Sequence, residues 1–193
     1  MDHLWAGWRS TYIEGAGDPD PAGCLFCRLP DLSDAESLIV ARGRTAFTVL
    51  NRYPYTTGHV MVAPFRHVPE PGDLSETERS EVWESLATAQ RAIQQTMSPD
   101  GFNLGANLGR VAGAGVPGHF HLHLVPRWTG DANFMTTVGA TRVLPEDLAD
   151  TWEKLRAALV SSPRANEVSD EGGDIPCVYL SSGLFDGGWL AVT

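Results

Sequence analysis

The feature that most constrains this chain is segment 119–124, in which histidine and apolar residues alternate as His-Phe-His-Leu-His-Leu. In a β-strand, successive side chains point to opposite faces of the sheet. A strand over 119–127 would therefore place His119, His121 and His123 on one face and turn the apolar residues between them into the core. Imidazole is a common metal ligand and a common nucleophile or base near neutral pH. We expect this cluster to serve chemistry rather than packing.

The segments around the histidines predict an α+β domain. Ser75 and Glu78 form a capping-box signature, and apolar residues follow at helical spacing, so we expect a long helix from Glu76 to Met97. A C-terminal helix is expected from Pro145 to residue 160. Strands, rich in β-branched and apolar residues, are expected over 37–42, 45–51, 59–64, 102–108 and 119–127. The predicted fold is an antiparallel sheet of about five strands with these two helices.

Length and charge limit the organisation and the partners. The 193 residues suit one domain, expected over 1–160, with a linker and C-terminal extension of unknown role over 161–193. The aromatic segment 4–13 and the apolar segment 175–193 predict that both ends pack on something. The net charge of −10 argues against non-specific nucleic-acid binding. The chain shows no secretory signal and no apolar run near the ~20 residues that span a bilayer, so we expect a cytoplasmic protein without a membrane partner.

The cysteines suggest a metal site. Three are too few for a disulfide scaffold, but Cys24 and Cys27 have the spacing that zinc sites use. A redox role fits less well, because the pair does not open a helix after a strand, and two free thiols in a tight turn are the simpler alternative. A tetrahedral site needs two more ligands, and His67 is a candidate. Cys177 is interpreted as a small apolar residue of the tail.

A glycine-rich segment, 109–118, directly precedes the histidines and bears on which chemistry they perform. We do not expect a stable helix or strand there, and its backbone N–H groups could approach a ligand closely. The histidines could hold a catalytic metal, as in a metal-dependent hydrolase. Alternatively, one imidazole attacks phosphorus while its neighbours orient it. The second chemistry needs donors around the phosphate oxygens, which exposed N–H groups supply, so we favour it.

Several of these motifs together resemble the histidine triad (HIT) family of nucleotide hydrolases and transferases. The alternating segment, Gly58-His59-Val60 and Asn51 carry this resemblance, which spans about residues 4–159. The motifs LWAGWR, NLGRVAGAG, VPRW and GDANFM look like the bacterial branch that includes diadenosine tetraphosphate phosphorylases. The resemblance implies an α+β homodimer with an antiparallel sheet, which acts on an adenine (di)nucleotide without an organic cofactor.

The resemblance also implies roles for individual residues. His121 would be the nucleophile, whose Nε2 attacks the α-phosphorus of a nucleoside phosphate ester, anhydride or amidate and forms a covalent nucleotidyl-histidine. His123 and His59 would flank the phosphate. Nucleotide or phosphate contacts would come from Asn51, on the ribose, and from Asn107, Gly115 and Trp128. In the zinc-containing branch, the first histidine of the triad completes the metal site, which here would comprise Cys24, Cys27, His67 and His119.

One position departs from the family pattern. Many HIT enzymes carry a serine shortly before the triad that protonates or holds the leaving group, whereas this chain reads Gly-Val-Pro-Gly over 115–118. The Gly115 N–H could still bind phosphate. The missing hydroxyl leaves phosphorolysis, hydrolysis and transfer open. It also makes a non-catalytic nucleotide-binding protein the alternative to an enzyme.

Overall fold

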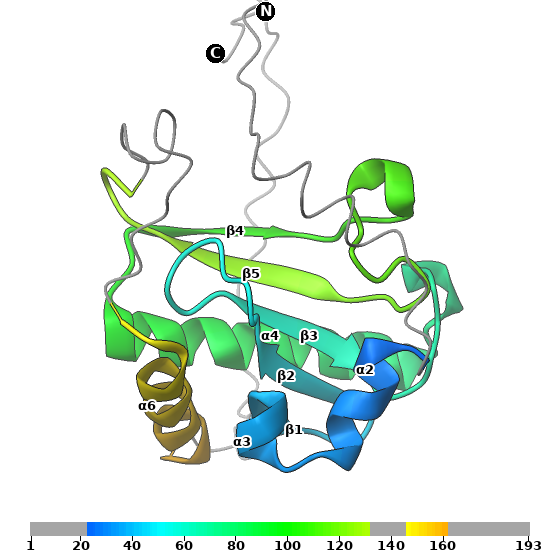
Figure 1. Cartoon of the computed structure of the whole chain (residues 1–193), viewed down its shortest axis with the longest axis horizontal. Helices are drawn as coiled ribbons and strands as arrows, with labels where there is room; N and C mark the ends of the chain where they lie inside the picture. The colour runs from blue at the N-terminus through cyan, green and yellow to red at the C-terminus, as the bar shows by residue number, and fades with distance from the viewer. Residues whose placement is uncertain (1–22, 132–145, 162–193) are drawn as a thin grey trace, which may run out of the picture. The chain divides into compact units, whose positions relative to one another are not determined.

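The computed structural model describes residues 23–131 and 146–161. In this part of the chain, five strands form one antiparallel sheet in the order β1-β2-β3-β5-β4 (Figure 1). The strands are β1 (Ile39–Arg42), β2 (Ala46–Leu50), β3 (Val60–Pro64), β4 (Gly101–Gly105) and β5 (Leu122–Arg127). The predicted α+β fold with a five-stranded sheet is confirmed. The expectations for segments 4–13 and 175–193 lie outside the described residues, and the domain boundary near residue 160 stays a prediction.

Helices cover both faces of the sheet. The long helix α4 (Glu76–Met97) and the helix α6 (Leu148–Ser161) pack on one face, and the short helix α2 (Leu25–Arg28) packs on the other (Figure 1). Strand β2 shows that both faces of the sheet are buried, because its side chains alternate between two apolar clusters, one on each face. Ala46 and Leu50 join the cluster beneath α4, whereas Phe47 and Val49 join the cluster that contains Phe26 of α2.

Helix α4 has the bounds that the sequence predicts. The Ser75 hydroxyl accepts from the Glu78 N–H, and the Glu78 carboxylate accepts from the Ser75 N–H at 2.7 Å, which completes the capping box. The hydrogen-bonded ion pair with Arg66, opposed by burial, holds the pKa of Glu78 at about 2. The cap therefore also ties α4 to the turn after β3. The buried apolar face of the helix comprises Val82, Leu86, Ala89, Ala92 and Ile93.

The N-terminal part holds helices that the sequence analysis missed. Helix α3 (Asp34–Ser37) begins with a second capping box, between Ser33 and Glu36, so β1 starts at Ile39 and not at residue 37. Leu38 ends the helix in the left-handed region, with φ of 61°. The Ser-x-x-Glu signature in the sequence was sufficient to find this helix. Three short 3-10 helices complete the described elements: η1 (Leu29–Asp31), η2 (Pro71–Asp73) and η3 (Arg110–Ala112).

Several further boundaries differ from the expectations, most of them by one residue and the following by more. Strand β4 ends at Gly105 and not at residue 108, and η3 forms a single turn inside the glycine-rich segment, between glycines of positive φ. Strand β5 begins at Leu122, so the first two histidines of the row precede the hydrogen-bonded ladder. Helix α6 is described from Leu148, where Asp147 accepts from the Asp150 N–H at 2.8 Å. Pro145 lies outside the described residues.

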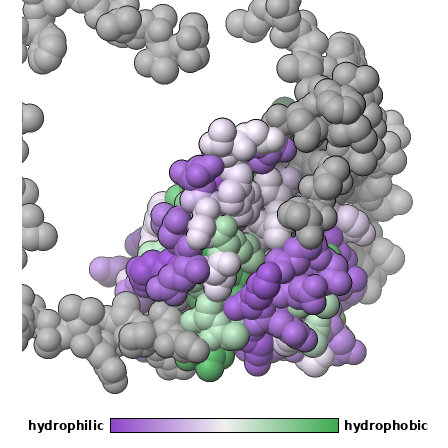
Figure 2. Space-filling model, turned by 90° about the vertical axis from the view of Figure 1, so that its left-hand side faces the viewer, coloured by the Kyte–Doolittle hydropathy of each residue, from purple (hydrophilic) through white to green (hydrophobic). Residues whose placement is uncertain are grey.

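One face of the molecule is mainly polar where it is described. Figure 2, which views the left-hand side of Figure 1, shows hydrophilic residues around a smaller hydrophobic area. No helix in residues 23–131 or 146–161 combines the length and the apolar content that crossing a membrane requires.

Candidate active site

His121 lies at the centre of the candidate site, with its two ring nitrogens in different surroundings. Nδ1 is 2.8 Å from the carbonyl oxygen of His119, and a carbonyl accepts only, so Nδ1 carries the proton. Burial lowers the pKa of His121, against the opposing effect of this hydrogen bond, so the ring is neutral near pH 7. In neutral imidazole the second nitrogen then has a free lone pair. His121 Nε2 is therefore equipped for nucleophilic attack.

His123 is linked to His59 across the sheet. Its Nδ1 is 3.0 Å from His59 Nε2, and β5 pairs with β3, which brings the two segments together. Burial and the charge of His121 lower the pKa of His123 to about 4. The His123 ring stands edge-on to that of His121, with 4.9 Å between ring centroids. This geometry places a second neutral imidazole beside that of His121.

The loop before β3 fixes His59 in place. The residue is fully buried, and its Nδ1 accepts from the Tyr55 N–H at 3.1 Å. Thr56 ties the same loop to β5 by donating to the Pro126 carbonyl at 2.7 Å. Gly58 has φ of 77°, a backbone conformation that is strained for any other residue, and a Cβ there would also displace the Met97 side chain, whose sulfur would lie 2.7 Å away. These contacts hold the loop tightly against the sheet.

Four predicted metal ligands meet at the other end of the histidine row. One candidate ligand atom from each of Cys24, Cys27, His67 and His119 lies within 4.8 Å of the others. Sγ of Cys24 is 3.3 Å from His119 Nδ1, and Sγ of Cys27 is 3.4 Å from His67 Nδ1. A tetrahedral zinc ion with ordinary bond lengths needs sulfur-to-nitrogen separations of about 3.5 Å. The residues present therefore fit zinc.

The second nitrogen of His119 supports this interpretation. His119 Nε2 is 2.9 Å from the Pro64 carbonyl, so Nε2 carries the proton and Nδ1 keeps its lone pair toward the thiols. Metal-bound histidines commonly donate their other N–H to a carbonyl in this way. Burial, with the hydrogen bond and charge of Cys24, raises the pKa of Cys27. A bound cation would offset this cost of ionising the thiols.

Phe26 joins the two ends of the site, and sequence reasoning did not single it out. It lies between the two cysteines in α2 and is only 2 % exposed. Its ring centroid is 4.6 Å from that of His121 and 5.3 Å from that of His119. Tyr55 was also missed, and its ring lies 4.7 Å from the ring of His59. The only available signals were their positions inside the Cys-x-x-Cys motif and the pre-histidine turn.

The four residues predicted to contact the nucleotide lie at different distances from the histidine site. Asn51 lies within the site, because its Nδ2 is 3.3 Å from His59 Nδ1. Asn107 follows β4 two residues beyond Gly105, which pairs with His123, so the chain there runs toward His121. Trp128 lies beyond the other end of β5, five residues from His123 or about 16 Å along an extended chain. Gly115 lies in the loop between η3 and the histidines. The nucleotide-binding roles of all four stay predictions.

The arrangement separates the two chemistries that the sequence left open. In the described part of the chain, the residues that could share one metal ion are the two cysteines, His67 and His119. His121 and His123 do not belong to that group, and their Nδ1 atoms are committed to the His119 carbonyl and to His59. The geometry therefore favours a nucleophilic histidine over a catalytic metal held by the triad.

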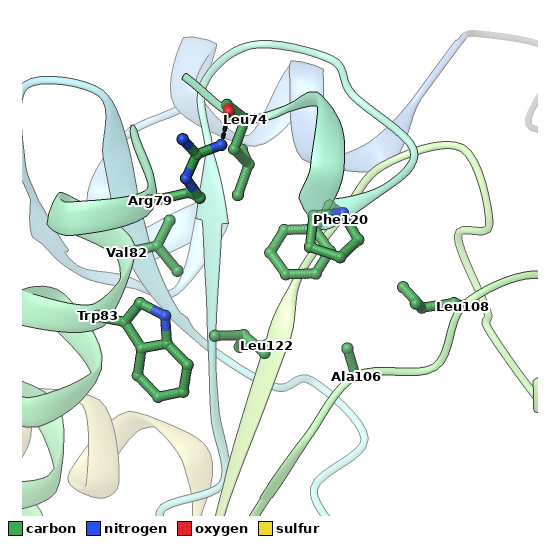
Figure 3. A pocket seen from close by; sticks show the side chains of 9 residues that line it. Leu74, Arg79, Val82, Trp83, Ala106, Leu108, Phe120 and Leu122 are labelled. Carbon is green, nitrogen blue, oxygen red and sulfur yellow. Dashed lines mark hydrogen bonds between the residues drawn. The ribbon is translucent and has the colours of Figure 1, made fainter. Parts of the chain in front are cut away.

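An apolar pocket lies on the opposite face of the sheet (Figure 3). Trp83 and Val82 of α4 line it from one side, and Phe120 and Leu122 line it from the histidine segment. Because side chains alternate there, these two residues point away from the site that the histidines form. The remaining lining residues are Pro71, Leu74, Arg79, Ala106 and Leu108. This pocket is therefore separate from the candidate active site.

Comparison with known proteins identifies the family of this chain. A family model described as the HIT domain matches residues 33–130. The chain belongs to the histidine triad family. The AP-4-A phosphorylase of Mycobacterium tuberculosis is 41% identical over 169 residues, which cover 84% of this chain and 87% of the relative. The match to this relative extends well beyond the segment that carries the family motif.

Two solved structures show the same fold. A hypothetical histidine triad nucleotide-binding protein from Sulfolobus tokodaii has a TM-score of 0.58 at 25% identity, covering 71% of this HIT protein and 92% of the other chain. A Zn-bound histidine triad family protein from Mycobacterium smegmatis has a TM-score of 0.56 at 26% identity, covering 72% and 94%. The described fold is thus the HIT fold.

Proposed function

We propose that this HIT protein is an enzyme that cleaves an adenine dinucleotide such as diadenosine tetraphosphate through a nucleotidyl-histidine. The observation that carries the proposal is the state of His121, with its Nδ1 bound to the His119 carbonyl and Nε2 left as a lone pair in a buried, neutral ring. The 41% identity to a protein named AP-4-A phosphorylase supports the dinucleotide as substrate.

The proposed reaction has two steps. His121 Nε2 forms a bond to the α-phosphorus, and the bond from phosphorus to the bridging oxygen breaks, so that ATP leaves with the bonding electron pair. An oxygen of inorganic phosphate then attacks the same phosphorus, the phosphorus–nitrogen bond breaks, and ADP is released. Water in place of phosphate would give AMP. His123, held by His59, would stabilise charge on the phosphate oxygens, with Asn107 and the Gly115 N–H as further proposed donors.

Product analysis tests this proposal. Purified protein is incubated with diadenosine tetraphosphate, with and without inorganic phosphate, and nucleotides are separated by ion-exchange chromatography. Phosphorolysis gives ADP and ATP only when phosphate is present, whereas hydrolysis gives AMP and ATP without it. His121→Ala is expected to abolish either reaction while the metal content and the circular dichroism spectrum stay unchanged. Turnover by this variant, or no products from the natural protein, would overturn the proposed mechanism.

We propose further that the cysteine and histidine cluster holds a structural zinc ion. It would hold the N-terminal loop against the catalytic segment through Cys24, Cys27, His67 and His119, and the reaction steps above do not involve it. The thiols must be reduced to bind metal, which agrees with the predicted cytoplasmic location. Elemental analysis of protein purified without added metal is expected to give one zinc per chain, and its absence would contradict the proposal.

We also propose that the protein is a homodimer formed through β4 and α4. Within the sheet formed by residues 23–131, β4 is an edge strand, and its Leu104 is 45 % exposed. Unpaired edge strands readily pair with another chain. Trp83 of α4, which is 56 % exposed beside the pocket of Figure 3, extends the same apolar face. Sedimentation equilibrium is expected to show a dimer, and a monomer after Trp83→Glu; a monomeric natural protein would contradict this proposal.

A further inference from the structure

The Asn51 side chain is oriented by a backbone contact that is independent of any substrate. Its Oδ1 accepts from the Tyr53 N–H at 3.0 Å. A backbone N–H requires an acceptor, so the atom on the other branch of the amide is the NH₂ group. This group points to His59 Nδ1, at 3.3 Å. Asn51 is therefore a donor toward His59.

Two hydrogen-bond donors therefore face the same ring nitrogen of His59. His59 Nδ1 faces both the Asn51 amide and the Tyr55 backbone N–H, which lies 3.1 Å away. A ring nitrogen that accepts from donors cannot carry a proton itself. Neutral His59 must therefore carry its proton on Nε2. This nitrogen lies 3.0 Å from His123 Nδ1 and donates to it.

The tautomer of His59 determines that of His123. Because His123 Nδ1 accepts from His59, neutral His123 carries its proton on Nε2. That nitrogen lies on the side of the ring away from His59, in the residue that stands edge-on to the nucleophile. His121 has the opposite tautomer, with its proton on Nδ1. The site thus pairs a bare Nε2 on His121 with an N–H on His123.

We propose that Asn51 is a positioning residue that acts through His59 and fixes the proton of His123 on Nε2. In this role it makes His123 a hydrogen-bond donor to the substrate phosphate, at a site that lacks the serine hydroxyl of many HIT enzymes. The inference rests on the proposed function for its catalytic consequence. It does not conflict with a ribose contact, because Asn51 keeps one amide hydrogen and one carbonyl lone pair for a ligand.

Histidine tautomers test the proposal directly. Long-range ¹H–¹⁵N correlation spectra of the ¹⁵N-labelled full chain at pH 7.5 distinguish protonated from bare ring nitrogens, with assignment by His59→Gln and His123→Gln. Both residues are expected to be protonated on Nε2 only. A proton on Nδ1 of either residue in the natural protein would overturn the proposal. This measurement needs no substrate, so its outcome is independent of whether diadenosine tetraphosphate is turned over.

Asn51→Asp separates the positioning role from a ribose contact. A carboxylate still accepts from ribose hydroxyls, but it cannot donate to His59 Nδ1 and would draw a proton onto it. We expect His59 to gain an Nδ1 proton and kcat to fall at least 10-fold, with KM changed less than 3-fold. Asn103→Asp, at an exposed asparagine bonded to Arg127, adds the same charge as a control and is expected to change neither. Unchanged His59 tautomers and kcat in Asn51→Asp would contradict the inference.

Discussion

The two ends of the histidine row show how one side chain takes two roles. His119 and His123 lie two residues to either side of His121, yet their ring nitrogens meet different partners. His119 faces the thiols with one nitrogen and the Pro64 carbonyl with the other. His123 accepts from His59 and turns its second nitrogen away from it. The first arrangement suits a metal ligand and the second suits a donor to substrate, so the role is set by the neighbours of each ring.

The largest effect should be a loss of activity when His123 is replaced. We expect His123→Gln to lower kcat by about 10²- to 10³-fold, the range typical for the loss of one hydrogen-bond donor to the charge of the transition state. The amide cannot reproduce the donor geometry of the ring beside His121. Zinc content by elemental analysis and the melting temperature serve as controls and should stay near the natural values. Loss of zinc from this variant would show that His123 also supports the proposed metal site, so that the two ends of the row do not act independently.

Removing a proposed zinc ligand at the His119 end should instead lower the stability of the fold. Cys27→Ser removes one of the four proposed ligands, and we expect it to abolish stoichiometric zinc. The free energy of unfolding should fall by about 3 kcal/mol or more, because metal binding contributes to folding where ligands from distant segments meet. Urea denaturation measures this loss. The kcat of the folded fraction should fall less than in His123→Gln, and the reverse order would contradict the division of roles.

The sequence was sufficient for features that local patterns encode. The capping box at Ser75 and the spacing of apolar residues gave α4, and alternation gave the common face of the histidines. Through the family resemblance, it was also sufficient to name the four cysteine and histidine residues that meet in one cluster. Contacts between segments far apart in the chain were another matter. The Phe26 ring meets the His121 ring from a distant segment, and Asn51 meets His59 only because the intervening turn folds back. No periodicity specifies such contacts, so the orienting roles of Asn51 and Phe26 required the structure.

Acid should test the His123 end of the row through the low pKa of this residue. The folded pKa of about 4 lies below the ordinary value of 6.5, so the unfolded chain binds more protons between these values. The free energy of unfolding therefore falls as the pH drops from 6.5 toward 4. From pH 7 to pH 5 this group should contribute a loss of about 2 kcal/mol. Urea denaturation at both pH values measures it.

The control for this pH effect is His123→Gln, which removes the titrating group and leaves the acidic residues in place. The loss between pH 7 and pH 5 should be smaller in the variant by the amount that His123 contributes. The rings that face His123 are those of His121, His59 and Tyr55. An identical pH dependence in both proteins would show that the folded chain accepts the proton on His123 without cost.

The smallest effect concerns Phe26, whose ring contacts both His119 at the metal end and the central His121. Phe26→Leu should lower the free energy of unfolding by about 1 to 2 kcal/mol, because it removes buried ring contacts to His119, His121 and Phe47. Phe47→Leu is the matched control, since Phe47 is equally buried at 1 % exposure and its ring packs on Phe26 and Phe65. Both variants should lose similar stability.

The two phenylalanine variants should differ in activity. Phe26→Leu removes the aromatic ring whose centroid lies 4.6 Å from that of His121, so the His121 ring is less firmly oriented. We therefore expect kcat to fall several-fold while zinc is retained. Phe47→Leu should leave kcat near the natural value. Equal losses of kcat in both variants would show that His121 depends on the general packing of this apolar cluster and not on its direct contact with Phe26. A loss confined to Phe26→Leu would show that the segment carrying both thiols also orients His121, which would make the metal end a support for the catalytic end.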